Sequence, residues 1–152
     1  MRIDKLWIKK FKNLKDFQID FDENQMTTVL IGRNGTGKSN LIEAIVIIFR
    51  DLDLGEHPAF SYDLTYICRD HKIRIVANAE KVSDHTEISI DDDDRISFSK
   101  FSKDNERKYL PRYVFAYYSG PGNRLENHFN PHSVPLHLEF SLINYASQRL
   151  DF

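Results

Sequence analysis

The chain has 152 residues, of which 41% are hydrophobic and 29% are charged, and its formal net charge is −2. This length suffices for one domain with its own hydrophobic core, so neither a disulfide nor a structural metal is needed for folding. The single cysteine, Cys68, cannot form an internal disulfide, which agrees with a reducing compartment. No apolar run reaches the ~18–20 residues of a membrane span, and the lysine-rich N-terminus lacks the apolar stretch of a signal peptide. We therefore expect a cytoplasmic protein without a membrane segment.

The charges are distributed unevenly along the chain. Residues 1–15 contain six basic side chains and one acidic one, whereas residues 84–94 contain six acidic side chains. A small negative net charge argues against a protein that binds nucleic acid with its whole surface. The basic segment is either a set of solvated strand and loop faces or an edge that meets a phosphate backbone, and charge alone leaves both interpretations open.

The first third of the chain predicts strands followed by a helix. Residues 2–8 and 17–21 alternate between apolar and polar side chains, which is typical of half-buried strands. Residues 27–31 form an apolar, β-branched run that ends at a glycine, and this predicts a strand buried on both faces. Residues 38–50 are predicted to be helical. Because residues 44–49 are apolar on every side, we expect this helix to lie between two layers.

The middle of the chain predicts an antiparallel meander. After a loop with Gly55 and Pro58, period-2 alternation recurs in short segments separated by polar turns. These four predicted strands are residues 60–68, 72–79, 85–90 and 95–101.

The last part of the chain predicts one more buried strand and a helix. Residues 113–118 are apolar and aromatic and end at Ser-Gly-Pro-Gly, as a buried strand does. After Pro135, apolar residues recur at helical spacing, which predicts a helix. The expected organisation is therefore strands, glycine loop and helix in 1–50, an antiparallel region in 60–118, and a loop and helix in 119–152.

Residues 32–39, Gly-Arg-Asn-Gly-Thr-Gly-Lys-Ser, match the P-loop pattern G-x-x-x-x-G-K-[ST]. The predicted strand before them and the predicted helix after them supply the strand–loop–helix context that the motif requires. Glycines allow backbone N–H groups to turn toward phosphate oxygens, and the start of a helix adds partial positive charge. In such a loop Lys38 binds the β- and γ-phosphates and the Ser39 hydroxyl is a ligand of Mg²⁺. The sequence therefore predicts binding of ATP with Mg²⁺; the alternative is a glycine-rich turn that contains Lys-Ser by accident.

Residues 31–45 resemble the Walker A segment of the ABC-type ATPase heads of the SMC, RecF and OLD families. Asn34, Asn40, Glu43 and Ala44 match that family pattern beyond the bare P-loop. The opening residues 3–21 are similar to the family's first hairpin, with its Phe-[KR]-[NS] corner at residues 11–13. A weaker similarity over residues 60–75 is to the AAA-type ATPases of bacterial restriction and antiphage systems.

The resemblance implies a fold, a site and partners. The fold is an α/β P-loop NTPase of the ABC-ATPase type, of which this chain is the N-terminal, β-rich lobe of an ATP-binding head. Two heads sandwich ATP in this family, so the resemblance implies a homo-oligomer. It also implies a machine that acts on DNA in repair or antiphage defence, with a nuclease partner or domain. The corner residues Lys12 and Asn13 contact ribose or phosphate in this reading, or else form a plain polar turn. The implied nucleotide-binding residues are Asn34, Gly35, Thr36, Gly37, Lys38, Ser39, Asn40, Lys12 and Asn13, with Ser39 on Mg²⁺.

The sequence also departs from the family pattern. No segment has the Walker B arrangement of four apolar residues followed by Asp-Glu, which such ATPases use to hold Mg²⁺ and to polarise the attacking water. The Leu-Ser-x-Gly signature is absent as well, and no glutamine stands where the family places one. We therefore expect an incomplete fold: the full-length protein is an ATPase, and this chain by itself is not catalytically complete. The alternative is an interaction module that senses nucleotide without hydrolysing it and regulates a partner protein.

Overall fold

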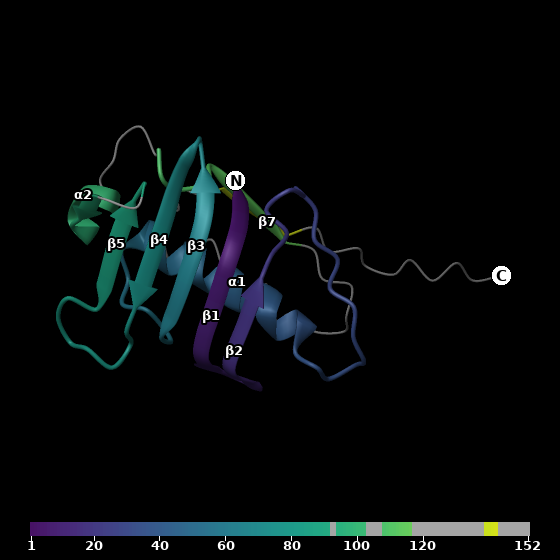
Figure 1. Cartoon of the computed structure of the whole chain (residues 1–152). Helices are drawn as coiled ribbons and strands as arrows, with labels where there is room; N and C mark the ends of the chain where they lie inside the picture. The colour runs from purple at the N-terminus through teal and green to yellow at the C-terminus, as the bar shows by residue number, and fades with distance from the viewer. Residues whose placement is uncertain (92–93, 103–107, 117–138, 143–152) are drawn as a thin grey trace.

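The computed structural model describes residues 1–91, 94–102, 108–116 and 139–142. Figure 1 shows a sheet in front of one long helix, which confirms the expected α/β architecture with a large antiparallel component. Within the described ranges, no helix combines the length and the apolar character needed to cross a bilayer. The elements in chain order are β1 (Arg2–Phe11), β2 (Leu14–Asp20), α1 (Lys38–Leu54), β3 (Tyr62–Cys68), β4 (His71–Ala77), β5 (Thr86–Ile90), β6 (Asp94–Ile96), α2 (Phe98–Ser102), β7 (Tyr113–Ala116) and β8 (Glu139–Leu142).

The main sheet has six strands in the order β2-β1-β3-β4-β5-β6, and every neighbouring pair is antiparallel. Two-residue turns join β1 to β2 and β3 to β4. In the second turn Arg69 and Asp70 both adopt positive φ, 47° and 67°, and two such residues match the right-handed twist of a hairpin. The predicted meander is confirmed, and the first hairpin joins it through the pairing of β1 with β3.

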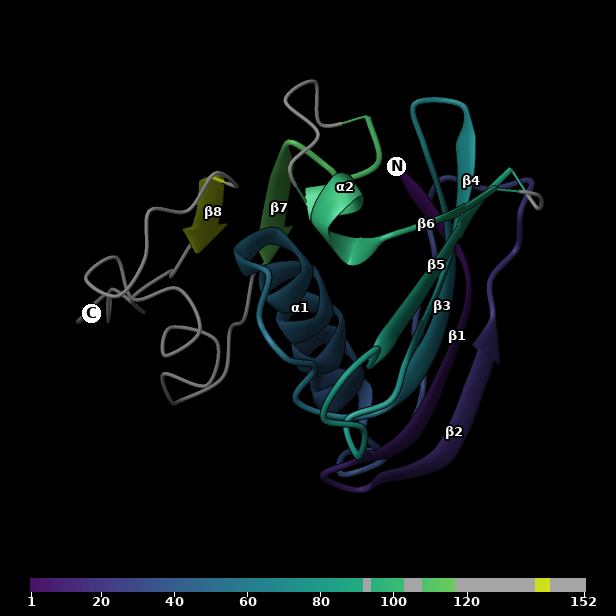
Figure 2. The same ribbon diagram turned by 90° about the vertical axis from the view of Figure 1, so that its left-hand side faces the viewer.

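Helix α1 packs on one face of this sheet and forms the core with it. The inward-facing residues alternate along each strand, as in the buried series Ile73, Ile75 and Ala77 of β4. Residues on most sides of α1 are buried, and Figure 2 shows α1 between the main sheet and the pair β7 and β8. The prediction of a helix between two layers is thereby confirmed. The free thiol of Cys68 lies in this core, and burial raises its pKa.

The segment 27–31 differs from its prediction as a buried strand. It has no regular secondary structure, and Val29 and Ile31 are 74% and 91% exposed. A strand needs hydrogen bonds from a neighbouring strand, and none of the described strands pairs with this segment. Its apolar pattern is therefore not sufficient to form a strand here.

The predicted strand 95–101 was correct only at its beginning. Residues 98–102 form the short helix α2, whose first turn is capped by Ser97: the Lys100 N–H donates to Ser97 Oγ at 3.3 Å. Phe98 and Phe101 are three residues apart, and the helix turns Phe101 into the core. A serine cap and this spacing override the alternation that suggested a strand.

Strand β7 lies outside the antiparallel region to which residues 113–118 were assigned. It pairs in parallel with β8, so that Tyr113 faces Glu139 and Ala116 faces Leu142. The prediction of a strand is confirmed for 113–116; within it Tyr113 is 42% exposed, whereas Val114 is partly buried and packs against the core. Residues 139–142 were expected to be helical and form β8 instead, since the ladder to β7 supplies their backbone hydrogen bonds. The remaining parts of the predicted loop and helix, 119–138 and 143–152, lie outside the described residues.

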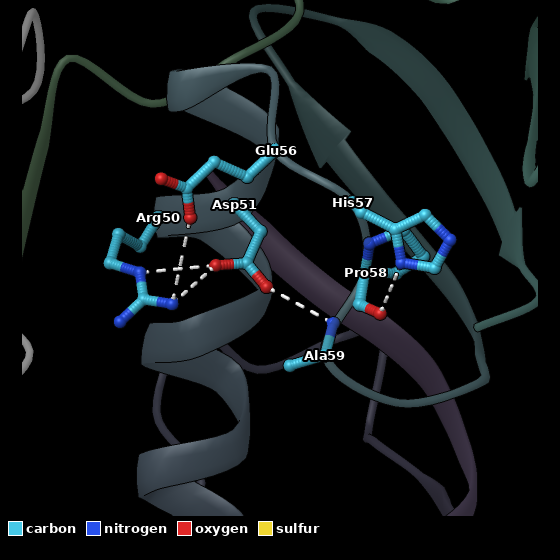
Figure 3. A network of polar contacts seen from close by, with 6 residues as sticks. All are labelled: Arg50, Asp51, Glu56, His57, Pro58 and Ala59. Atoms are coloured by element: carbon cyan, nitrogen blue, oxygen red, sulfur yellow. Dashed lines mark hydrogen bonds and ion pairs between the residues drawn. The ribbon is translucent and has the colours of Figure 1, made fainter.

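A network of polar contacts fixes the C-terminal end of α1 (Figure 3). The buried Asp51 carboxylate accepts hydrogen bonds from Arg50 Nη2 at 2.7 Å and from the Ala59 N–H at 3.3 Å. The Asp51 carbonyl accepts the backbone N–H groups of Gly55 and Glu56, and Gly55 has the positive φ, 70°, that commonly ends helices. Helix α1 is thus tied to the loop that leads into β3.

Candidate functional site

The glycine loop ends at the N-terminus of α1. Gly37 is the N-cap residue and adopts φ 105°, no side chain caps the first turn, and that turn contains no acidic residue. The first N–H groups of a helix have no partner within the helix, and they carry partial positive charge. The start of α1 therefore offers backbone donors to an anion in a place where no carboxylate competes.

The ammonium group of Lys38 folds back over the loop. Its Nζ lies 2.5 Å from the Gly32 carbonyl oxygen and 2.8 Å from the Arg33 carbonyl oxygen. An ammonium has three donors, so these two contacts leave one N–H for a further acceptor. The loop carbonyls thus hold the cationic group at the loop rather than in open solvent.

The Arg33 carbonyl oxygen is also the closing point of the turn 33–36. The Thr36 N–H donates to it at 3.4 Å and the Thr36 hydroxyl at 2.9 Å. Together with Lys38, three donors converge on one oxygen. The conformation of the turn and the position of the ammonium are therefore connected.

The corner between β1 and β2 packs against this loop. Asn13 Nδ2 donates to the Gly35 carbonyl oxygen at 3.0 Å, and Asn40 Nδ2 in the first turn of α1 donates to Asn13 Oδ1 at 2.6 Å. A Cβ at Gly37 would lie 2.8 Å from Leu14 Cδ2 and 3.1 Å from Asn13 Oδ1. The corner approaches the loop so closely that a side chain at position 37 would require the Leu14 and Asn13 side chains to shift.

Lys12 and Glu43 anchor the same corner to α1. Lys12 Nζ lies 2.5 Å from both carboxylate oxygens of Glu43, whose residue exposure is 4%. Lys12 adopts φ 52°, which is uncommon for a residue with a side chain. The sequence reasoning assigned no role to Glu43. Its signal was a carboxylate within the otherwise apolar stretch 41–49 of the helix, since a buried charge requires a partner.

The residues predicted for the site come together at one end of α1. Asn34, Gly35 and Thr36 are exposed on the loop, and Ser39 and Asn40 are half-buried in the first helical turn. Lys12 and Asn13, which are distant in sequence, join them through the contacts with Glu43, Gly35 and Asn40. A surface cavity of about 330 Å³ lies elsewhere: it is lined by Asp84–Ile88 and Arg95–Phe98, and Phe98 lies beside Gly55 at the other end of α1.

Comparison with known proteins identifies relatives of this chain. The family model of the AAA ATPase domain matches residues 1–149. The DNA replication and repair protein RecF of Lactobacillus acidophilus is 44% identical over 48 residues, which are 32% of this chain and 12% of RecF. The DNA double-strand break repair Rad50 ATPase of Archaeoglobus fulgidus is 30% identical over 123 residues, covering 73% of this chain and 13% of Rad50.

A solved SMC ATPase structure, from work on ATP-driven dimerization and DNA-stimulated activation, matches with a TM-score of 0.44 at 17% identity, over 86% of this chain and 92% of that one. The chain spans 12% and 13% of the length of the RecF and Rad50 relatives. The family model, in contrast, covers nearly the whole chain, and it includes both the glycine loop and the first hairpin. This chain therefore belongs to the AAA ATPase domain family, and its expected relation to the ABC-type ATPase heads of the SMC and RecF class is confirmed.

Proposed function

We propose that residues 32–40 bind ATP with Mg²⁺. The observation that supports this most directly is the uncapped start of α1 behind a loop whose glycines, Gly35 and Gly37, have φ values of 85° and 105°. Such a loop presents backbone N–H groups to the oxygens of a phosphate chain. The Lys38 ammonium is already held at the loop and is available to the β- and γ-phosphates.

The donor set also fits a metal–triphosphate complex. An ammonium, a hydroxyl at Ser39 and the helix N–H groups stand together, and the first turn of α1 contains no acidic side chain. We assign Ser39 as the Mg²⁺ ligand, and the ion would neutralise charge on the triphosphate. Asn34, Thr36 and Asn40 complete the loop side of the site, and Lys12 and Asn13 form its hairpin side.

On the scale of the whole protein, we propose that residues 1–152 are the N-terminal lobe of an ABC-type ATPase head. The RecF and Rad50 relatives, both named for DNA repair, support a role in a DNA-acting machine. By the same relation we propose that two heads pair around ATP in the full-length protein, in the cytoplasm. More specifically, we propose that this machine includes a nuclease partner or domain and acts in DNA repair or antiphage defence.

Replacing Lys38 with alanine tests the nucleotide site. The ammonium makes charge-assisted contacts, each worth about 1.5–3 kcal/mol, so Lys38→Ala should weaken Mg-ATP binding about tenfold or more. Calorimetric titration of Mg-ATP into the wild-type and variant chains measures this change.

Lys100→Ala is the matched control, because Lys100 is an exposed lysine on α2 and is not part of the loop. It should bind Mg-ATP like the wild type. Equal affinity of Lys38→Ala and wild type, with both proteins folded, would falsify the assignment of this loop as a phosphate site.

A further inference from the structure

The side-chain amides of Asn13 and Asn40 form a chain whose orientation is fixed by chemistry. A backbone carbonyl can only accept hydrogen bonds, so Asn13 must present its Nδ2 to Gly35. Its Oδ1 then faces Asn40, which must in turn present its own Nδ2. Both hydrogen bonds therefore run in the same donor-to-acceptor direction: Asn40 in α1 donates to Asn13 at the hairpin corner, and Asn13 donates to the loop.

These two amides hold the carbonyl end of one peptide unit of the loop, the peptide between residues 35 and 36. Because the peptide is planar, the Gly35 carbonyl and the Thr36 N–H point in opposite directions. Asn13 binds the carbonyl end at 3.0 Å, and the Arg33 carbonyl oxygen binds the N–H end at 3.4 Å. The peptide between residues 35 and 36 is thus fixed at both ends.

The same peptide connects Asn13 to the phosphate-binding lysine. The Arg33 oxygen that receives the Thr36 N–H also receives Lys38 Nζ at 2.8 Å. A rotation of the 35–36 peptide would remove one of the donors that close this turn, and the Arg33 oxygen, one of the two acceptors of Lys38, would move with it. The position of the ammonium therefore depends in part on an amide that does not touch it.

The hairpin corner itself is held firmly enough to act as a support. Lys12 binds both oxygens of the buried Glu43 carboxylate, and it does so from a positive φ of 52°. A residue with a side chain keeps such a conformation only when its surroundings determine it. Asn13, the next residue, is consequently presented to the loop from a fixed base on α1.

We propose that Asn13, oriented by Asn40, is a positioning residue of the nucleotide site, which holds the 35–36 peptide and through it the Lys38 ammonium. This inference rests on the proposed nucleotide site. It differs from a direct contact of Asn13 with ribose or phosphate, because it requires Asn40 and acts on the loop before nucleotide is bound.

Asn13→Ala, Asn40→Ala and the double variant test the proposal by Mg-ATP titration. Loss of this hydrogen bond at the solvent-exposed edge of the loop should weaken Mg-ATP binding about three- to tenfold. Both single changes interrupt the same series of hydrogen bonds. The double variant should therefore bind Mg-ATP no more weakly than Asn13→Ala does. An effect of Asn13→Ala alone would mean that Asn13 acts directly on the nucleotide, and additive losses would mean that the two amides act independently. Either result would overturn the positioning proposal.

Hydrogen exchange without nucleotide separates this proposal from the proposed function. Amides in peptides covering residues 32–41 should exchange faster in both single variants than in the wild type. Asn13→Asp should show the largest increase, because its second carboxylate oxygen would face the Gly35 carbonyl while its first keeps the bond from Asn40.

Asn78→Ala is the control, because Asn78 Oδ1 accepts the Glu80 N–H in the turn after β4 and is not part of the loop. It should leave exchange in residues 32–41 unchanged. Unchanged loop exchange in Asn13→Ala and Asn40→Ala would overturn the positioning role. If loop exchange is faster in both variants than in the wild type but the wild-type chain fails to bind Mg-ATP, the nucleotide site would be refuted and the positioning of the loop by Asn13 would stand.

Discussion

Two glycines of the loop are required for different physical reasons. Gly35 and Gly37 both have positive φ, 85° and 105°, which is strained for residues with a side chain. Around Gly35 an added Cβ would meet no atom within 4 Å, whereas at Gly37 it would lie 2.8 Å from Leu14 Cδ2. Backbone conformation alone restricts position 35, and the close approach of the hairpin further restricts position 37.

The two glycine-to-alanine variants should therefore differ in stability. Positive φ costs an alanine about 1–2 kcal/mol at either position. Gly37→Ala adds a clash with the corner, and overpacking of this kind costs about 1–3 kcal/mol more. Urea unfolding of both variants measures the difference in the free energy of unfolding. Equal losses would show that the corner moves away from position 37 without cost.

At the scale of elements, α1 is fixed at both ends by polar contacts. At its N-terminal end the ion pair of Lys12 with Glu43 joins it to the first hairpin. At its C-terminal end Asp51 joins it to the loop before β3 (Figure 3). Burial raises the pKa of Asp51 above its ordinary value of 3.8, although the hydrogen bonds from Arg50 and Ala59 act in the opposite direction.

The raised pKa of Asp51 makes the stability of the chain depend on pH in a definite direction. Between 3.8 and the higher folded value, the folded state binds the proton and the unfolded state does not. The free energy of unfolding therefore contains a contribution that is complete below pH 3.8 and is lost as the pH rises through the folded pKa. The asparagine in Asp51→Asn does not titrate. As the pH rises through that window, the stability of this variant relative to wild type should therefore increase.

Denaturant unfolding of wild type and Asp51→Asn at a series of pH values, starting below pH 3.8, measures this effect. Glu56→Gln serves as the comparison, because Glu56 belongs to the same network but is half exposed, and its charge is the smallest contribution to the raised pKa of Asp51. Its difference from wild type should therefore follow that trend much more weakly. Parallel stability curves for Asp51→Asn and wild type would show that Asp51 has the same pKa in the folded and unfolded states.

At the scale of the whole molecule, nucleotide binding and nucleotide hydrolysis have different requirements. Binding needs the loop, the helix start and Lys38, all of which the described residues contain. Hydrolysis in this class of ATPase also needs acidic residues that position Mg²⁺ and the attacking water. The sequence of 152 residues has no Asp-Glu pair after an apolar run.

We accordingly expect the 152-residue chain to release phosphate from Mg-ATP at the uncatalysed rate. Phosphate release by wild type should equal that by Ser39→Ala, in samples whose nucleotide binding has been measured in parallel. Turnover by wild type that disappears in Ser39→Ala would reveal a catalytic acid within these residues and contradict the expectation of an incomplete site.

Local patterns in the sequence determined the loop, α1 and most of the meander. The P-loop spacing located the candidate site, since glycines, lysine and serine act within a few residues of each other. Period-2 alternation located β3, β4 and β5, because each strand places alternate residues in the core. In each case the information lies within one continuous segment.

Only the tertiary structure decided the features that depend on a partner distant in sequence. Residues 27–31 have the composition of a buried strand but no strand partner among the described residues, while 139–142 form a strand because β7 pairs with them. The contacts of Lys12 with Glu43 and of Asn13 with Gly35 likewise join segments 31 and 22 residues apart. Backbone and side-chain groups find their hydrogen-bond partners across the fold, and a linear pattern does not specify which partner a group will meet.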